Sequence, residues 1–127
     1  MGGTQITPNL IGLKESLPYL LTGKNISPIK AKKLGLIDHV VDQGLIDKAS
    51  LMIAENPKKK KKKSNLIDSI LSKMILNYAQ KDVSSKTKNL YPAPIKILEV
   101  LKNTYPYQNL YYEKDLFCNL VSTSESK

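Results

Sequence analysis

Apolar residues recur at helical spacing along most of this chain, and glycine or proline separates one apolar segment from the next. Leu13, Leu17 and Leu20 fall on one face of a helix, and Gly23 follows where a left-handed residue commonly ends a helix. Pro18 lies inside this segment, so we expect it to kink the helix or to shift its start. The spacing predicts short amphipathic helices rather than strands.

The segment SPIKAKKLG carries the clearest helix boundaries. Ser27 is a natural N-cap, Pro28 suits the first helical position, and Gly35 closes the helix after about two turns. Further helices are predicted for residues 4–10 with Thr4 as the cap, 45–55, 64–78, 95–102 and 109–121.

Three segments are expected to lie outside these helices. Residues 36–41 favour a short extended segment, and the polar residues 81–89 should fray. Pro92 and Pro94 should hold the chain extended before the helix that follows them. The expected fold class is therefore mainly α, with at most one short strand.

The charge of the chain is strongly basic. The 127 residues carry a formal net charge of +9, and six consecutive lysines, Lys58–Lys63, supply much of it. Like charges repel along a helix or strand, so this run is expected to form a solvated loop. The sequence contains no arginine, the residue that makes bidentate contacts with guanine edges and phosphates. The charge allows non-specific polyanion binding but does not favour specific recognition of nucleic acid.

Features typical of membrane and disulfide-linked proteins are not found in the sequence. No apolar run reaches the length of about 18 residues that a membrane span needs, and no targeting peptide is visible. The single cysteine, Cys118, excludes an internal disulfide framework and suits a reducing compartment.

Few residues suggest a catalytic or ligand-binding role. His39 is the only histidine, so no second imidazole can share a metal, and a structural or exposed position is expected. Cys118 lies beside Phe117 on an apolar helix face and is expected to be a small core residue rather than a nucleophile. Gly2-Gly3-Thr4 could cradle an anion at a helix N-terminus, but a tight turn with a cap is favoured because the glycine element is short.

Carboxylates and tyrosines do not form a recognisable site either. The glutamates are scattered over separate helices, and no two of them suggest a general acid and base: Glu15, Glu55, Glu99, Glu113 and Glu125. A tyrosine cluster is expected to pack against a partner helix rather than to stack on nucleic-acid bases, because most lysines lie elsewhere. Its members are Tyr105, Tyr107, Tyr111 and Tyr112. The sequence predicts no catalytic, cofactor-binding or metal-binding residue.

Two sets of residues resemble a known family. The first comprises Gly2-Gly3-Thr4-Gln5, Ile11-Gly12, Leu21-Thr22-Gly23, Ile26, Ala31, Gly35-Leu36-Ile37 and Val40. It resembles the latter part of the enoyl-CoA hydratase (crotonase) domain. The second comprises Lys88-Asn89-Leu90-Tyr91-Pro92-Ala93-Pro94, Ile95-Lys96-Ile97 and residues 122–127. It resembles the alpha subunits of the mitochondrial trifunctional enzyme, in which a hydratase domain precedes a 3-hydroxyacyl-CoA dehydrogenase domain.

The resemblance covers nearly the whole chain except the lysine run, and it implies a domain plan. Residues 1–57 would be the C-terminal part of a crotonase-like α/β spiral domain, incomplete on its own. Residues 58–63 would be a lysine-rich loop, and residues 64–127 would be terminal and linker helices before a dehydrogenase domain. The family usually has arginine after Gly-Gly-Thr-Gln, whereas this chain has Ile6, which puts the local packing in doubt.

The resemblance also implies that the catalytic groups of the parent enzyme lie outside this chain. The two glutamates and the oxyanion-hole amides of the family's hydratase lie upstream of the glycine pair, and no G-x-G-x-x-G nucleotide loop occurs in this sequence. The chain is therefore expected to be a catalytically silent fragment of a mitochondrial β-oxidation enzyme. Its helices would cover the acyl-CoA site and form the oligomer or interdomain interface. The parent would use NAD and assemble with a thiolase-type beta subunit.

Two further interpretations remain open on the sequence. The chain could be a small basic helical protein that binds nucleic acid or acidic partners through Lys58–Lys63. The same lysines could give weak contact with anionic lipid of the inner mitochondrial membrane. If the helices are a fragment, they should leave apolar stripes exposed, and the isolated chain should self-associate or aggregate.

Overall fold

The computed structural model describes residues 2–55, 66–87 and 91–122, and every regular element in these ranges is a helix. In chain order the elements are α1 (Gly3–Ile11), α2 (Leu13–Thr22), α3 (Pro28–Leu34), the 3-10 helix η1 (Gln43–Leu45), α4 (Ile46–Glu55), α5 (Leu66–Thr87), α6 (Pro92–Thr104) and α7 (Leu110–Val121). The prediction of a mainly α fold is confirmed. Residues 36–41 form no strand, since no other strand lies beside them in the described ranges.

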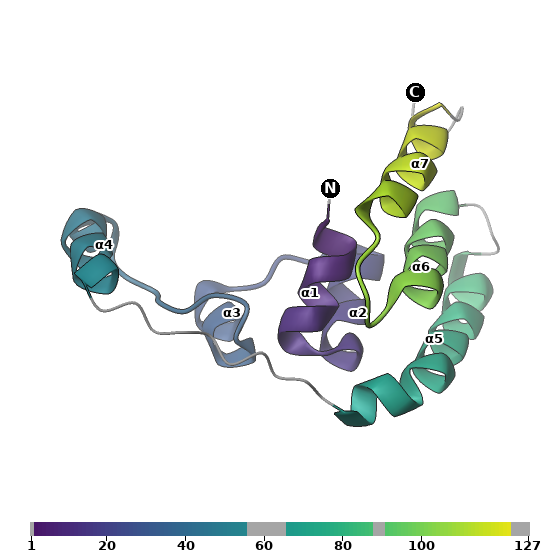
Figure 1. Cartoon of the computed structure of the whole chain (residues 1–127), viewed down its shortest axis with the longest axis horizontal. Coiled ribbons are helices and arrows are strands. Elements are labelled where there is room, and N and C mark those ends of the chain that lie inside the picture. The colour runs from purple at the N-terminus through teal and green to yellow at the C-terminus, as the bar shows by residue number, and fades with distance from the viewer. Residues whose placement is uncertain (1, 56–65, 88–90, 123–127) are drawn as a thin grey trace.

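Helices α1, α2, α5, α6 and α7 pack into one body, with α6 in contact with the other four (Figure 1). The buried core comprises Leu13 and Leu17 of α2, Leu76, Ala79 and Val83 of α5, and Leu98 and Leu101 of α6. Helices from both sides of the lysine run thus share one core. The division into residues 1–57, 58–63 and 64–127 stays a prediction.

Helices α3 and α4 lie apart from this body (Figure 1). The boundaries of α3 are those predicted: the Ser27 hydroxyl accepts a hydrogen bond from the Lys30 amide at 3.4 Å, and Gly35 adopts φ of +85°. Ala31 is buried in α3, whereas α4 has no buried residue. The local sequence therefore sets these two helices without much help from the core.

The start of α1 differs from the prediction. Gly2, with φ of +97°, precedes the first helical residue, and its carbonyl accepts hydrogen bonds from the amides of Gln5 at 3.1 Å and Ile6 at 2.8 Å. The glycine therefore supplies a backbone conformation that other residues rarely adopt. Thr4 lies inside the helix, so the prediction that its hydroxyl caps the helix is wrong.

Helices α5 and α6 also differ from the prediction. α5 continues through residues 81–87, because Val83 is buried and the Asp82 carboxylate pairs with Lys86 at 2.8 Å. α6 begins at Pro92, so the chain there is helical rather than extended. Prolines fit the first helical turn because its amides have no partner within the helix.

Candidate functional site

An apolar groove lies where the end of α2, the first turn of α6 and the last turns of α7 meet. Its volume is about 710 Å³, and we call it the α6–α7 groove. Leu21, Ile97, Phe117, Leu120 and Val121 provide its apolar walls. Ile97 also packs against the core cluster, so the buried part of α6 fixes one wall of the groove.

Residues of both resembling sets converge on this groove. Thr4 comes from the Gly-Gly-Thr-Gln block, Leu21 from the Leu-Thr-Gly block, and Tyr91–Pro94 and Ile97 from the second set. These residues are far apart in the sequence, and sequence reasoning did not place them together. Pro92 and Pro94 fit the first turn of α6 because amides there have no partner within the helix.

A buried polar cluster holds α7 against α1. The Glu113 carboxylate, 8% exposed, accepts hydrogen bonds from the Gly2 amide at 2.9 Å and from the Gln5 side chain at 2.8 Å. Gln5 also donates to the Asn109 carbonyl at 3.0 Å and accepts from the Asn109 amide at 2.7 Å. The four residues are called the Gln5–Glu113 cluster. Because each partner is satisfied, the cluster fixes α7 as a wall of the α6–α7 groove.

Sequence reasoning missed this cluster because it treated Glu113 as one of several scattered glutamates. The spacing of Asn109 and Glu113 offered a signal, since both lie on one helical face and could reach a single partner. The identity of that partner, Gln5, follows only from the fold.

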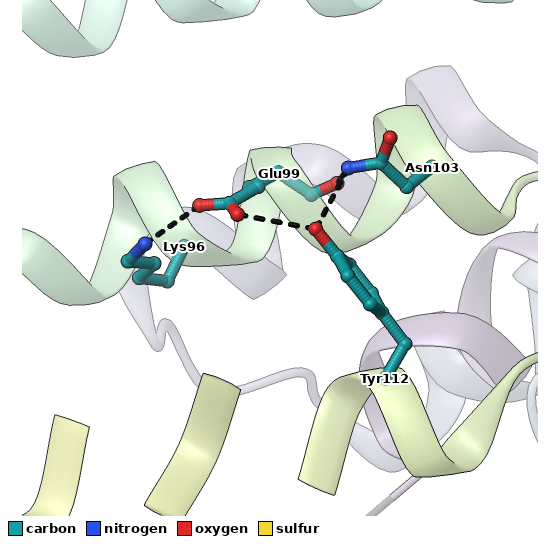
Figure 2. A network of polar contacts seen from close by, with 4 residues as sticks. All are labelled: Lys96, Glu99, Asn103 and Tyr112. Carbon is teal, nitrogen blue, oxygen red and sulfur yellow. Dashed lines mark hydrogen bonds and ion pairs between the residues drawn. The ribbon is translucent and has the colours of Figure 1, made fainter. Parts of the chain in front are cut away.

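A second network joins α6 and α7 nearer the surface, as Figure 2 shows. Glu99 accepts a hydrogen bond from Lys96 at 2.8 Å and one from the Tyr112 hydroxyl at 3.1 Å. Asn103 donates to that hydroxyl at 2.9 Å. The Lys96 ammonium, with help from Tyr112, lowers the pKa of the Glu99 carboxyl. Desolvation and the hydrogen bond to Glu99 raise the pKa of the Tyr112 hydroxyl.

The structure places the candidate residues of the sequence apart from one another. His39 is exposed between α3 and α4, in agreement with the expectation of a structural or exposed position. Cys118 is exposed, and Phe117 is 53% exposed, so the prediction that Cys118 is a core residue is wrong. Glu113 lies on the face of α7 that packs against α1. Cys118 lies on a different face of the same helix.

The tyrosine cluster divides into two pairs. Tyr105 packs against the core and Tyr112 bonds to α6, which confirms packing against a helix for these two. Tyr107 and Tyr111 are each 82% exposed and pack against little within the described ranges. The Lys58–Lys63 run lies outside the described residues.

Among the residues that the structure describes, no arrangement typical of an NAD site or a metal centre is found. The sequence has no glycine-rich nucleotide loop, and in the described ranges no helix follows a strand to hold a pyrophosphate. The same ranges contain no group of three or more histidine, cysteine or acidic side chains that could hold a metal ion. None of the described helices is both long and apolar enough to cross a membrane.

Comparisons with known proteins reveal one group of relatives. No family model matches the chain. The chain is 40% identical to the fatty acid oxidation complex subunit alpha of Vibrio parahaemolyticus, 39% to that of Vibrio cholerae and 34% to that of Shewanella baltica. Each match covers 99% of this chain but only 19%, 20% and 19% of the respective relative. The chain thus spans about a fifth of the length of these curated relatives.

These relatives correct one expectation. They come from Vibrio and Shewanella, which are bacteria, so the prediction of a mitochondrial protein is wrong. The expected contact with the inner mitochondrial membrane is dropped with it. The prediction of a fatty acid β-oxidation protein is supported by the names of the same relatives.

Proposed function

Because the chain is a homologue of one segment of the alpha subunits of bacterial fatty acid oxidation complexes, we propose that it forms the helical cover of an acyl-CoA site in such a subunit. The α6–α7 groove would face the acyl chain. The wider subunit would be crotonase-like, would hydrate enoyl-CoA and, in a second domain, would oxidise the product with NAD. Residues outside this chain would provide the catalytic groups and the NAD site.

The main support for this proposal is that residues from both sets that resemble the known family line the same groove. Ile97, Phe117, Leu120 and Val121 offer apolar surface of the kind that an acyl chain buries. Each buried CH₂ group contributes about 0.8 kcal/mol, so a groove of this size can discriminate between long and short chains. The Gln5–Glu113 cluster supports the same function because it keeps the α7 wall in place.

The names of the relatives describe subunits of a complex, which supports an oligomeric assembly as part of the proposal. A thiolase-type beta subunit would be the partner of the alpha subunit. The alternative of a small basic binding protein rests on Lys58–Lys63, which lie outside the described residues, and no contact in the described ranges favours it.

A chimera tests the proposal. The segment of the Vibrio parahaemolyticus alpha subunit that matches this chain is replaced by this chain, and hydration of long-chain and short-chain enoyl-CoA is measured. We expect hydration by the chimera and none by this chain alone. A chimera that folds but does not hydrate enoyl-CoA would refute the proposal, and so would turnover by the isolated chain.

A substitution in the groove refines the test. Phe117 is 53% exposed, so Phe117→Asp should leave the fold intact while placing a charge beside the acyl chain. Loss of about 1 kcal/mol of apolar contact should raise KM for a long-chain substrate about fivefold and leave that for a short-chain substrate unchanged. Tyr111→Asp, on the same helix but outside the groove lining, is the matched control. Equal effects of the two substitutions would show that the groove does not contact the acyl chain.

A further inference from the structure

Helix α4 carries an apolar stripe that no other part of the described chain covers. Ile46, Met52 and Ile53 lie on one face of α4 and are 52%, 62% and 40% exposed. Leu45, the last residue of η1, directly precedes them and is 52% exposed. Leu51, 66% exposed, lies on the opposite side of the helix. An exposed apolar face of a helix can bind in an apolar groove.

A second groove, which adjoins the α6–α7 groove at Leu21, has the complementary pattern. It lies between α2 and α5, has a volume of about 800 Å³, and is called the α2–α5 groove. Leu71, Met74 and Tyr78 of α5 line it at i, i+3, i+7 spacing, opposite Pro18 and Leu21 of α2. Met74 and Tyr78 are 70% and 77% exposed, so this groove has an apolar surface that packing in the described chain leaves open.

The charges of the two surfaces are also complementary. Residues 38–55, which include α4, carry four carboxylates and one lysine in a chain whose formal net charge is +9. The α2–α5 groove has Lys14, Lys86 and Asp82 among its lining residues, and since Lys86 pairs with Asp82, Lys14 provides the excess positive charge. Helix α4 itself holds Asp47, Glu55 and Lys48, a formal charge of −1, so it suits this groove better than a basic helix would.

The position of α4 indicates whether the helix in the α2–α5 groove comes from the same chain or from a second copy. In Figure 1, α4 stands at the end of an arm beyond α3, away from α2 and α5 of its own chain. We propose that two copies of this chain exchange their α4 helices, so that α4 of each copy lies in the α2–α5 groove of the other. The exchange is reciprocal and closes with twofold symmetry, so it yields a dimer rather than an open filament. The docked α4 would lie beside the proposed acyl-CoA site, because Leu21, Thr87 and Pro94 line both grooves.

Sedimentation velocity on the whole chain tests the proposal. We expect a dimer, and we expect Met52→Glu and Met74→Glu each to weaken dimerisation at least tenfold while the helical circular dichroism is retained. Leu51→Glu, a neighbour of Met52 with similar exposure but on the other helix face, should change the dimer dissociation constant less than twofold. A monomeric wild type, or equal effects of Met52→Glu and Leu51→Glu, would overturn the proposal.

Disulfide trapping identifies the exchange directly. In a Cys118→Ser background, one chain carries Met52→Cys and a second carries Met74→Cys, and the two are mixed under mild oxidation. We expect a disulfide between the two chains, and none when Leu51→Cys replaces Met52→Cys. A chain with both Met52→Cys and Met74→Cys that closes a disulfide as a monomer would overturn the exchange in favour of docking within one chain. These results do not depend on hydratase activity, so they stand or fall apart from the proposed function.

Discussion

Removal of the Glu113 carboxylate should destabilise the chain far more than removal of an ordinary helix carboxylate. Glu113→Ala leaves the Gly2 amide and one amide hydrogen of Gln5 without their acceptor in a buried position. Hydrogen bonds to a charged group contribute about 1.5–3 kcal/mol each. Because the small side chain admits some water, we expect a loss of about 3 kcal/mol rather than the full sum.

This loss is a large part of the free energy of unfolding of a domain of this size, which is about 5–15 kcal/mol. A loss of about 3 kcal/mol should lower the melting temperature by roughly 12 °C, at roughly 4 °C per kcal/mol. The assay is urea and thermal unfolding followed by circular dichroism, at a fixed protein concentration because the chain is proposed to dimerise.

Asp115→Ala is the matched control, since Asp115 is an exposed carboxylate on the same helix. It should change the free energy of unfolding by no more than about 0.5 kcal/mol. If Glu113→Ala and Asp115→Ala have the same effect, the Gln5–Glu113 cluster does not hold α7 to α1, and the α7 wall of the α6–α7 groove loses its support.

Three further predictions concern the core, a helix end and the pH dependence. Leu98→Ala removes a side chain that is 1% exposed and should cost about 2–5 kcal/mol in urea unfolding, whereas Leu51→Ala should cost less than about 0.5 kcal/mol at a concentration where the chain is monomeric. Gly35→Ala should cost about 1 kcal/mol through backbone strain alone, because φ is +85° and nothing lies within 4 Å of an added Cβ. The lowered pKa of Glu99 means that its contribution to stability is present above its usual pKa and is lost as the pH falls through the lowered value. Glu99→Gln should therefore reduce the loss of melting temperature on acidification, and an unchanged pH profile would contradict the network in Figure 2.

Local signals allowed part of the fold to be predicted from the sequence. Ser27, Pro28 and Gly35 bound α3 as expected, because caps and left-handed glycines depend on a few neighbouring residues. Asn109 likewise begins α7 by accepting a hydrogen bond from the Tyr112 amide at 3.1 Å. Exposed apolar stripes were expected for a fragment without naming helices, and α4 and α5 carry exposed apolar residues.

Tertiary contacts account for what the sequence did not reveal. Cys118 was assigned to the core because its neighbours are apolar, but the inward face of α7 is set by the bonds of Glu113 to α1. The helical continuation to Thr87 depends on burial of Val83 against the core, which overrides the polar composition of the segment. The α6–α7 groove could not be predicted, because its lining residues come from five helices whose packing is not encoded in any one segment.

Photolabelling tests the central claim most directly. A long-chain acyl-CoA with a photoreactive group at the end of the acyl chain is cross-linked to the chimeric alpha subunit, and the labelled residues are identified by mass spectrometry. Our account predicts labels on Ile97, Phe117, Leu120 or Val121, and their loss when unlabelled long-chain acyl-CoA competes. Competable labels that fall only outside this chain would contradict the claim that these helices cover the acyl-CoA site.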